Sequence, residues 1–276
     1  MPADAYDAAV APAPSGLERL LRHDRAVVAV ALFSTAAIAW ISLLRAPLGM
    51  DGSAAGTDAA MPGMSMPSVH AWSALDVLSL FLMWATMMVA MMLPSAAPMI
   101  LLVATIHRRR RERASPAVPT VIFAAGYLVV WTAFSAAAAL TQWGLHQTAL
   151  LSPAMASTSP VFSGALLILA GAYQWLPVKS ACLSRCRSPL GFLGSEWREG
   201  VAGTVVMGLR HGLFCLGCCW ALMALLFVAG VMNPLWVAAI AGLVLLEKVT
   251  RLGPGVGRLA GLALVAWGAW MLVKAL

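Results

Sequence analysis

The sequence has few charged residues, and this scarcity excludes an ordinary soluble domain. Charged residues make up 11% of the 276 residues and apolar residues 61%, whereas soluble domains carry roughly 25% charged residues. The mean hydropathy is +0.85. The chain is therefore predicted to be an all-α, polytopic bundle of transmembrane helices whose surroundings are a lipid bilayer.

The sequence also lacks the motifs that would identify a soluble activity. It contains no GxxxxGK[ST] phosphate-binding loop, so ATP-driven pumping by this chain alone is not expected. The 5 cysteines are odd in number and are not distributed like a secreted disulfide framework. The basic residues cluster at the ends of apolar segments, which membrane topology explains better than nucleic-acid binding. Whether the chain is an enzyme stays open, and a metal-binding or transport role is favoured.

The apolar segments predict about seven membrane spans, each near the length of about 20 residues that a bilayer requires. They are 26–44, 74–106, 118–140, 161–178, 201–231, 235–250 and 258–275. Most of the 18 Lys and Arg residues then fall on one side, which places the N-terminus in the cytoplasm and the C-terminus outside, in a bacterial inner membrane. Residues 1–25 are predicted to be a disordered cytoplasmic segment, and 26–276 the helical bundle.

Two of these segments carry further predictions. The first is expected to remain as an uncleaved helix, because no convincing cleavage site follows it before Arg45. The fifth is longer than the bilayer core requires. Its first turns are expected to lie along the cytoplasmic interface, or the helix is interrupted near Gly212 or Gly217.

The segment 46–72 is predicted to be an outer, periplasmic loop that is rich in methionine. Its Gly, Ser, Ala and Pro content is typical of a flexible loop, and thioether sulfur is a soft ligand suited to Cu(I). A capping box, Ser73 to Asp76, then begins the second span. The alternative is a loop with incidental methionines. The candidate metal-binding residues of the loop are Met61, Met64, Met66 and His70.

The second span contains a methionine stripe. Met83, Met87 and Met91 are four residues apart and share one helical face. Methionine also fills irregular gaps between packed helices, and taken alone the stripe favours that interpretation. It becomes a candidate metal path only if sulfur from other spans reaches the same depth.

The stretch HGLFCLGCCW in the fifth span carries the strongest chemical signal. His211, Cys215, Cys218 and Cys219 lie close together around one helical face. Imidazole and thiolate are ligands for soft metal ions, so this stripe is a candidate metal site. Redox-active thiols and simple packing of small apolar side chains are the alternatives.

Two further groups extend this candidate site. Cys182 and Cys186 are four residues apart at the inner end of the fourth span, where they would receive or pass on an ion. The alternative is a short basic cytoplasmic loop with incidental cysteines. Glu247 is a costly residue within a bilayer unless it is paired or bound; Lys248 or Arg210 would be its partner if it is not a metal ligand. Counting inward from the helix ends places Glu247 at about the depth of Cys219, Met87 and Gln174.

Several quoted motifs resemble a bacterial family of unknown function described as predicted metal-binding integral membrane proteins. They are MWATMMVAMMLPSAAP, GYLVVW, GAYQWLPVKSACLSRCRSP and HGLFCLGCCWALM, followed by VMNPLW and LEK, within residues 72–250. The resemblance implies several transmembrane helices and a metal site at the Cys/His motif, which corresponds to His211, Cys215, Cys218 and Cys219.

These features together predict that the protein binds and handles a soft metal ion in the membrane. Donor softness points to Cu(I), with zinc or another soft ion as the alternative. The ion would be transported or delivered to a partner, either a copper-requiring membrane enzyme or a metallochaperone. A membrane thiol oxidoreductase that uses Cys182/Cys186 and Cys215/Cys218/Cys219 is the competing hypothesis, and Cys215 and Cys218 do have the C-x-x-C spacing.

Overall fold

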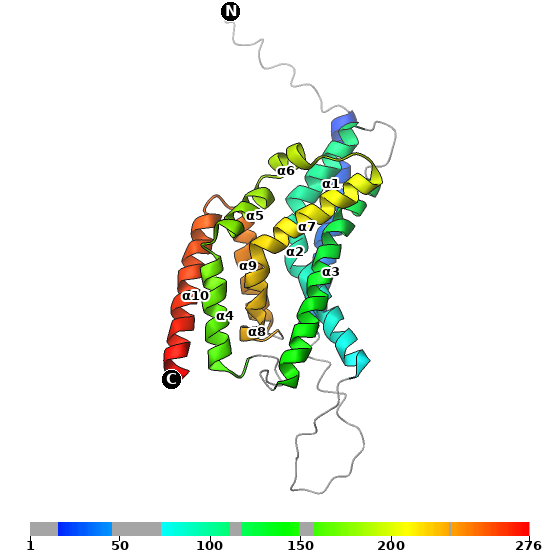
Figure 1. Ribbon diagram of the computed structural model, residues 1–276. Helices are drawn as coiled ribbons and strands as arrows, with labels where there is room; N and C mark the ends of the chain where they lie inside the picture. The colour runs from blue at the N-terminus through cyan, green and yellow to red at the C-terminus, as the bar shows by residue number, and fades with distance from the viewer. Residues whose placement is uncertain (1–15, 46–72, 111–116, 149–156, 232, 276) are drawn as a thin grey trace, which may run out of the picture.

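The computed structural model describes residues 16–45, 73–110, 117–148, 157–231 and 233–275, and these form helices joined by short connections (Figure 1). The prediction of an all-α chain is confirmed for these residues. The helices are α1 Gly16–Arg45, α2 Ala74–Arg110, α3 Ala117–Gln147, α4 Pro160–Tyr173, α5 Pro177–Arg187, α6 Pro189–Glu196, α7 Gly200–Ala224, α8 Leu226–Ala229, α9 Pro234–Val249 and α10 Gly253–Ala275.

Local sequence signals set several helix starts. Ser73 and Asp76 form the predicted capping box: the Ser73 backbone N–H donates to Asp76 Oδ2 (2.8 Å), and the Asp76 N–H donates to Ser73 Oγ (3.3 Å). Ser159 caps α4 and Asn233 caps α9, each followed by a proline at the first helical position. The helix α1 begins at Gly16, earlier than the predicted boundary at residue 26.

Within the described ranges, 5 helices are long and apolar enough to cross a membrane, or 6 if α4 and α5 form one bent span. The chain is thus a multi-pass membrane protein. The helix α9 has 16 residues, which is about 24 Å of helix and shorter than a bilayer core of about 30 Å. Length and composition therefore support fewer spans than the predicted number of about seven.

The fourth and fifth predicted spans differ in detail from expectation. The predicted segment 161–178 breaks after Tyr173, and the axes of α4 and α5 differ by 62°. The fifth segment is not interrupted at Gly212 or Gly217; α7 continues to Ala224 and crosses the bundle obliquely (Figure 1). These two glycines instead allow close packing, because a Cβ on Gly212 would lie 2.8 Å from Val130 Cγ2 and one on Gly217 would lie 2.7 Å from Cys182 Sγ.

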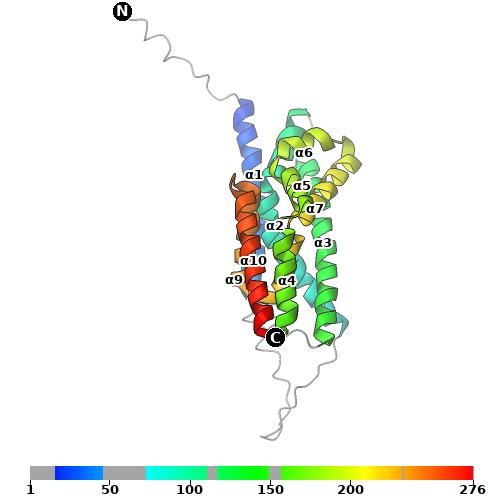
Figure 2. The same ribbon diagram turned by 60° about the vertical axis from the view of Figure 1, so that its left-hand side comes forward.

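Glycine contacts also set the two closest helix crossings. At the α3–α7 crossing, a Cβ on Gly208 would lie 2.3 Å from the carbonyl oxygen of Phe123, and one on Gly126 would lie 2.7 Å from that of Val205. Helices α4 and α10 run side by side (Figure 2), with Gly171 against Gly261. Small residues let helix backbones approach closely in membranes. The α3–α7 crossing fixes which face of α7 is turned toward the core.

Candidate functional site

The candidate site is built on the buried face of α7. His211 is 3% exposed, and Cys215, Cys218 and Cys219 are each 1% exposed. Their spacing in the sequence places them on adjacent turns of one face. Helix α7 packs against α3, α4, α5 and α9, and Cys219 also approaches Met92 of α2, so the three thiols lie inside the bundle and are shielded from lipid.

Cys215 lies at the centre of the site. Its sulfur is 3.1 Å from the hydroxyl of Tyr127 on α3 and accepts a hydrogen bond from Lys248 Nζ on α9 (2.9 Å). Lys248 also donates to Ser95 Oγ on α2 (3.0 Å). The Tyr127 hydroxyl in turn donates to the Met92 carbonyl (3.1 Å). Polar contacts therefore link α2, α3 and α9 around this sulfur atom of α7, and Tyr127 and Lys248 contact it directly.

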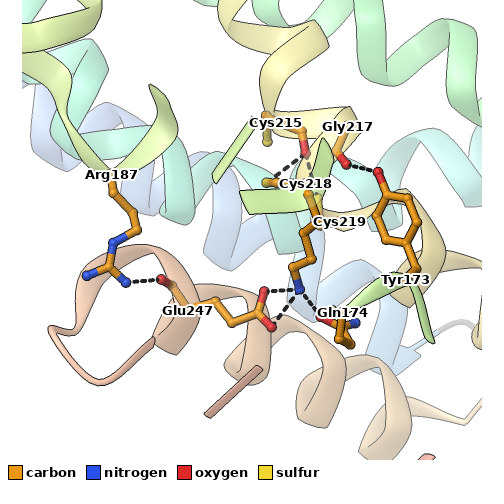
Figure 3. Close-up of polar contacts among 9 residues, drawn as sticks. Tyr173, Gln174, Arg187, Cys215, Gly217, Cys218, Cys219 and Glu247 are labelled. Carbon is orange, nitrogen blue, oxygen red and sulfur yellow. Dashed lines mark hydrogen bonds and ion pairs between the residues drawn. The ribbon is translucent and has the colours of Figure 1, made fainter. Parts of the chain in front are cut away.

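The other sulfur atoms surround Cys215. The thiols of Cys218 and Cys219 turn back along α7 and donate to the Cys215 carbonyl at 3.1 and 2.9 Å (Figure 3). Cys219 Sγ is also 3.9 Å from the thioether sulfur of Met92. From α5, the Cys186 thiol lies within interaction range of Cys215 and Cys218, and the Cys182 sulfur packs against Gly217. All five cysteines are free and gather where α5 meets α7.

A buried ion pair lies beside the cysteines. Lys179 Nζ is 2.7 and 2.8 Å from the two carboxylate oxygens of Glu247, and it also donates to Gln174 Oε1. Arg187 donates to the Glu247 carbonyl (2.8 Å), as Figure 3 shows. The expectation that Lys248 or Arg210 neutralises Glu247 is wrong. Lys179 is the partner, Lys248 bonds Cys215, and Arg210 pairs with Glu196.

His211 lies in an aromatic enclosure at the same end of the site. Its ring centroid is 5.9 Å from that of Phe123, 5.6 Å from Tyr127 and 5.3 Å from Phe192. Its Nδ1 atom is buried and has no hydrogen-bond partner. Buried polar atoms are nearly always hydrogen-bonded, so an unpaired one calls for an explanation. An imidazole nitrogen with its lone pair unused is a potential metal ligand.

The remaining predicted residues contribute less to this arrangement. Met87 and Met91 are buried in the apolar core and Met83 is half-buried against it; the thioether beside a thiol is that of Met92. Among the described residues, no three His, Cys, Asp or Glu side chains are placed to hold one ion together. The loop candidates Met61, Met64, Met66 and His70 lie outside the described residues.

Three participants were not predicted to contact the thiols. Tyr127 and Ser95 are unremarkable in sequence, since Tyr and Ser are common in membrane helices. Lys248 has a signal, because a lysine inside an apolar segment is costly unless it has a partner. The sequence suggested that Lys248 pairs with its neighbour Glu247. Adjacent residues of a helix point about 100° apart, so the two side chains find different partners.

The comparison with protein families identifies the metal that the protein handles. The model of a family described as "PpoB2: Copper chaperone" matches residues 81–271. The chain belongs to the PpoB2 copper chaperone family. No curated protein and no solved structure matches it.

As a member of the PpoB2 family, the protein handles copper within a membrane-embedded helical bundle. The predicted function of metal handling is confirmed at this level, and copper is confirmed as the metal. A chaperone also implies a protein that receives the copper. The matched range spans α2 to α10 and therefore includes the whole cysteine cluster of α5 and α7.

Proposed function

We propose that the bundle binds copper as Cu(I) at the sulfur cluster of Cys186, Cys215, Cys218, Cys219 and Met92. The observation that carries this proposal is that Cys219 of α7 lies 3.9 Å from the thioether of Met92 on α2, while Cys186 of α5 lies within interaction range of Cys215 and Cys218. Buried cysteine is by itself an ordinary small apolar residue. Sulfur from three helices around a charged lysine has no comparable packing purpose.

The chemistry of the donors favours Cu(I) over zinc. Structural zinc sites are closed tetrahedra of four Cys or His ligands, and no such preformed set exists among the described residues. Thiolate and thioether together are the donors that select Cu(I). The Cys218 and Cys219 thiols donate to a carbonyl of their own helix, and Cys219 also lies 3.9 Å from Met92 Sδ, so rotation about one side-chain bond is enough to turn them toward an ion.

Glu247 and the stripe Met83, Met87 and Met91 have secondary roles in this proposal. The Glu247 carboxylate is already neutralised by Lys179 and positions α9, which carries Lys248. The methionine stripe lies on the same helix as Met92 and provides soft atoms along the way from the outer end of α2. The outer loop residues Met61, Met64, Met66 and His70 remain a proposed collection segment.

Cys186 and Cys182 are proposed to move copper between the cluster and a partner. Cys186 lies within interaction range of the Cys215 and Cys218 thiols and also lines a cavity between the helices. Ligand exchange between neighbouring thiols lets an ion move without being released as a free ion. The receiving protein is a copper-requiring membrane enzyme or a second metallochaperone.

The proposed topology has the N-terminus and the α5–α6 end in the cytoplasm of a bacterial inner membrane. The helix α2 begins at the opposite end of the bundle from α5 and α6 (Figure 1), so residues 46–72 would precede it on the periplasmic side. Lys179, Arg185, Arg187 and Arg198 all lie near the α5–α6 end, in agreement with the positive-inside rule. Seven passes result if α9 crosses as a short helix.

The decisive experiment is elemental analysis of the protein purified anaerobically from copper-replete cells. We expect about one copper per chain, lost in the Cys215→Ser/Cys218→Ser variant. The matched control is Cys182→Ser, because Cys182 is half-buried against Gly217 and is not among the proposed ligands. A protein that carries no copper but titrates as a thiol/disulfide pair would instead be an oxidoreductase.

A further inference from the structure

A cavity adjoins the cysteine cluster, and its lining carries the same sign of charge as a free copper ion. It has a volume of ≈ 200 Å³ and lies between α2, α5, α6, α7 and α9. The polar and sulfur-bearing residues that line it are Ser95, Met99, Cys186, Arg187, His211 and Lys248. Two of these are cations, and no carboxylate lines the cavity within the described ranges.

Neither cation forms an ion pair with a carboxylate in the part of the chain that the structure describes. Lys248 Nζ bonds the Ser95 hydroxyl and the Cys215 sulfur. Arg187 Nη1 bonds a backbone carbonyl, that of Glu247. The carboxylate of Glu247 is bound by Lys179 instead. The cavity thus presents positive charge and the unpaired Nδ1 of His211 next to the proposed copper ligands.

This charge is unfavourable for a bare copper ion and favourable for an anion. Like charges repel strongly where water is excluded, so free Cu⁺ would be repelled at the mouth of its own site. A cleft lined by one sign of charge concentrates ligands of the opposite sign. In a reducing compartment abundant thiols are kept unoxidised, and Cu(I) held by two thiolates is an anion.

We propose that this cavity receives copper as an anionic complex of Cu(I) with small thiolates, held by Arg187 and Lys248 while the sulfur ligands exchange. This inference rests on the proposed function and names the form of its substrate. The volume is several times the share of about 30 Å³ that one water has in the liquid, which suits a thiol of a few heavy atoms.

The exchange is a substitution at copper without change of oxidation state. The Cys186 sulfur forms a bond to Cu(I) as one donor thiolate leaves, and Cys215 then replaces the second. Each protein thiol that binds gives its proton to a departing thiolate, so that the donors leave as neutral thiols and charge balances. Delivery to a partner is the same sequence in reverse.

The test compares copper loading from two small thiol donors whose Cu(I) complexes are both anions, the one with carboxylates being the more negatively charged. Cu(I) is presented anaerobically with excess mercaptoacetate or with excess mercaptoethanol, and the rate of Cu–thiolate absorbance is followed in the full-length protein in detergent. We expect the carboxylate-bearing donor to load about tenfold faster at low salt. This preference should fall as ionic strength rises.

Variants of the cavity residues test whether the preference for the carboxylate-bearing donor arises in the cavity. Arg187→Gln should reduce it to near unity while the final copper content stays the same, and Arg187→Lys, which keeps the charge, should preserve most of it. Arg251→Gln is the matched control, since Arg251 is exposed and does not line the cavity. Equal rates from both donors in the wild-type protein, or an unchanged preference in Arg187→Gln, would overturn the inference. Failure to bind copper from either donor would refute the proposed function instead.

Discussion

Replacing Lys179 with methionine should destabilise the bundle severely, whereas replacing Lys179 and Glu247 together should not. Lys179 Nζ lies 2.7 and 2.8 Å from the two carboxylate oxygens, and the side chains are 3% and 1% exposed. Removing one partner of such a pair leaves a buried charge uncompensated, which costs about 3–5 kcal/mol. Replacing both with apolar residues of similar size is often neutral or stabilising.

The variants Lys179→Met, Glu247→Met and the double variant would be unfolded in mixed micelles and followed by the fluorescence of the 11 tryptophans. We expect each single variant to lose several kcal/mol, and the double variant to lose far less than the sum of the two single effects. Additive single effects would refute the ion pair.

Copper content separates this role of Glu247 from that of a metal ligand. Because Lys179 already occupies the carboxylate, the folded double variant should keep its full copper content. A folded double variant that binds no copper would show that Glu247 coordinates the ion. In that case the ion pair seen here would belong only to the empty protein.

Three further substitutions test the positions of α7, α2 and α9. Gly208→Ala should lower the free energy of unfolding by about 1–3 kcal/mol through overpacking, because its Cβ would lie 2.3 Å from a backbone oxygen of α3. The control is Gly144→Ala in the same unfolding assay. Its Cβ would have nothing within 4 Å, so the change should be neutral or slightly stabilising. Met92→Leu should weaken copper retention against a chelator by several-fold, and Met83→Leu should not, because Met92 is the thioether beside Cys219. Lys248→Met should slow copper release to the same chelator, because it removes a cation 2.9 Å from Cys215 Sγ; unchanged release would show that this ammonium does not compete with the ion.

The sequence alone was sufficient where the relevant geometry lies within one helix. His211, Cys215, Cys218 and Cys219 share a buried face because helical periodicity places them there. The capping box at Ser73 is equally local. These features depend on neighbours a few residues apart, so no knowledge of the packing is required.

Contacts between helices could not be predicted from the sequence in the same way. Lys179 reaches Glu247 because the chain turns by 62° between α4 and α5, and a continuous span through residue 178 would place it in a loop. Met92 meets Cys219, although counting from the helix ends favoured Met87. An error of one helical turn in such counting is enough to exchange these two methionines.

X-ray absorption spectroscopy of the copper-loaded protein shows whether copper is bound by sulfur from different helices at the α5–α7 junction. We expect Cu(I) with a first shell made of sulfur, and loss of that shell in the Cys215→Ser/Cys218→Ser variant. A first shell of nitrogen and oxygen, or a sulfur shell that survives in this variant, would contradict this expectation.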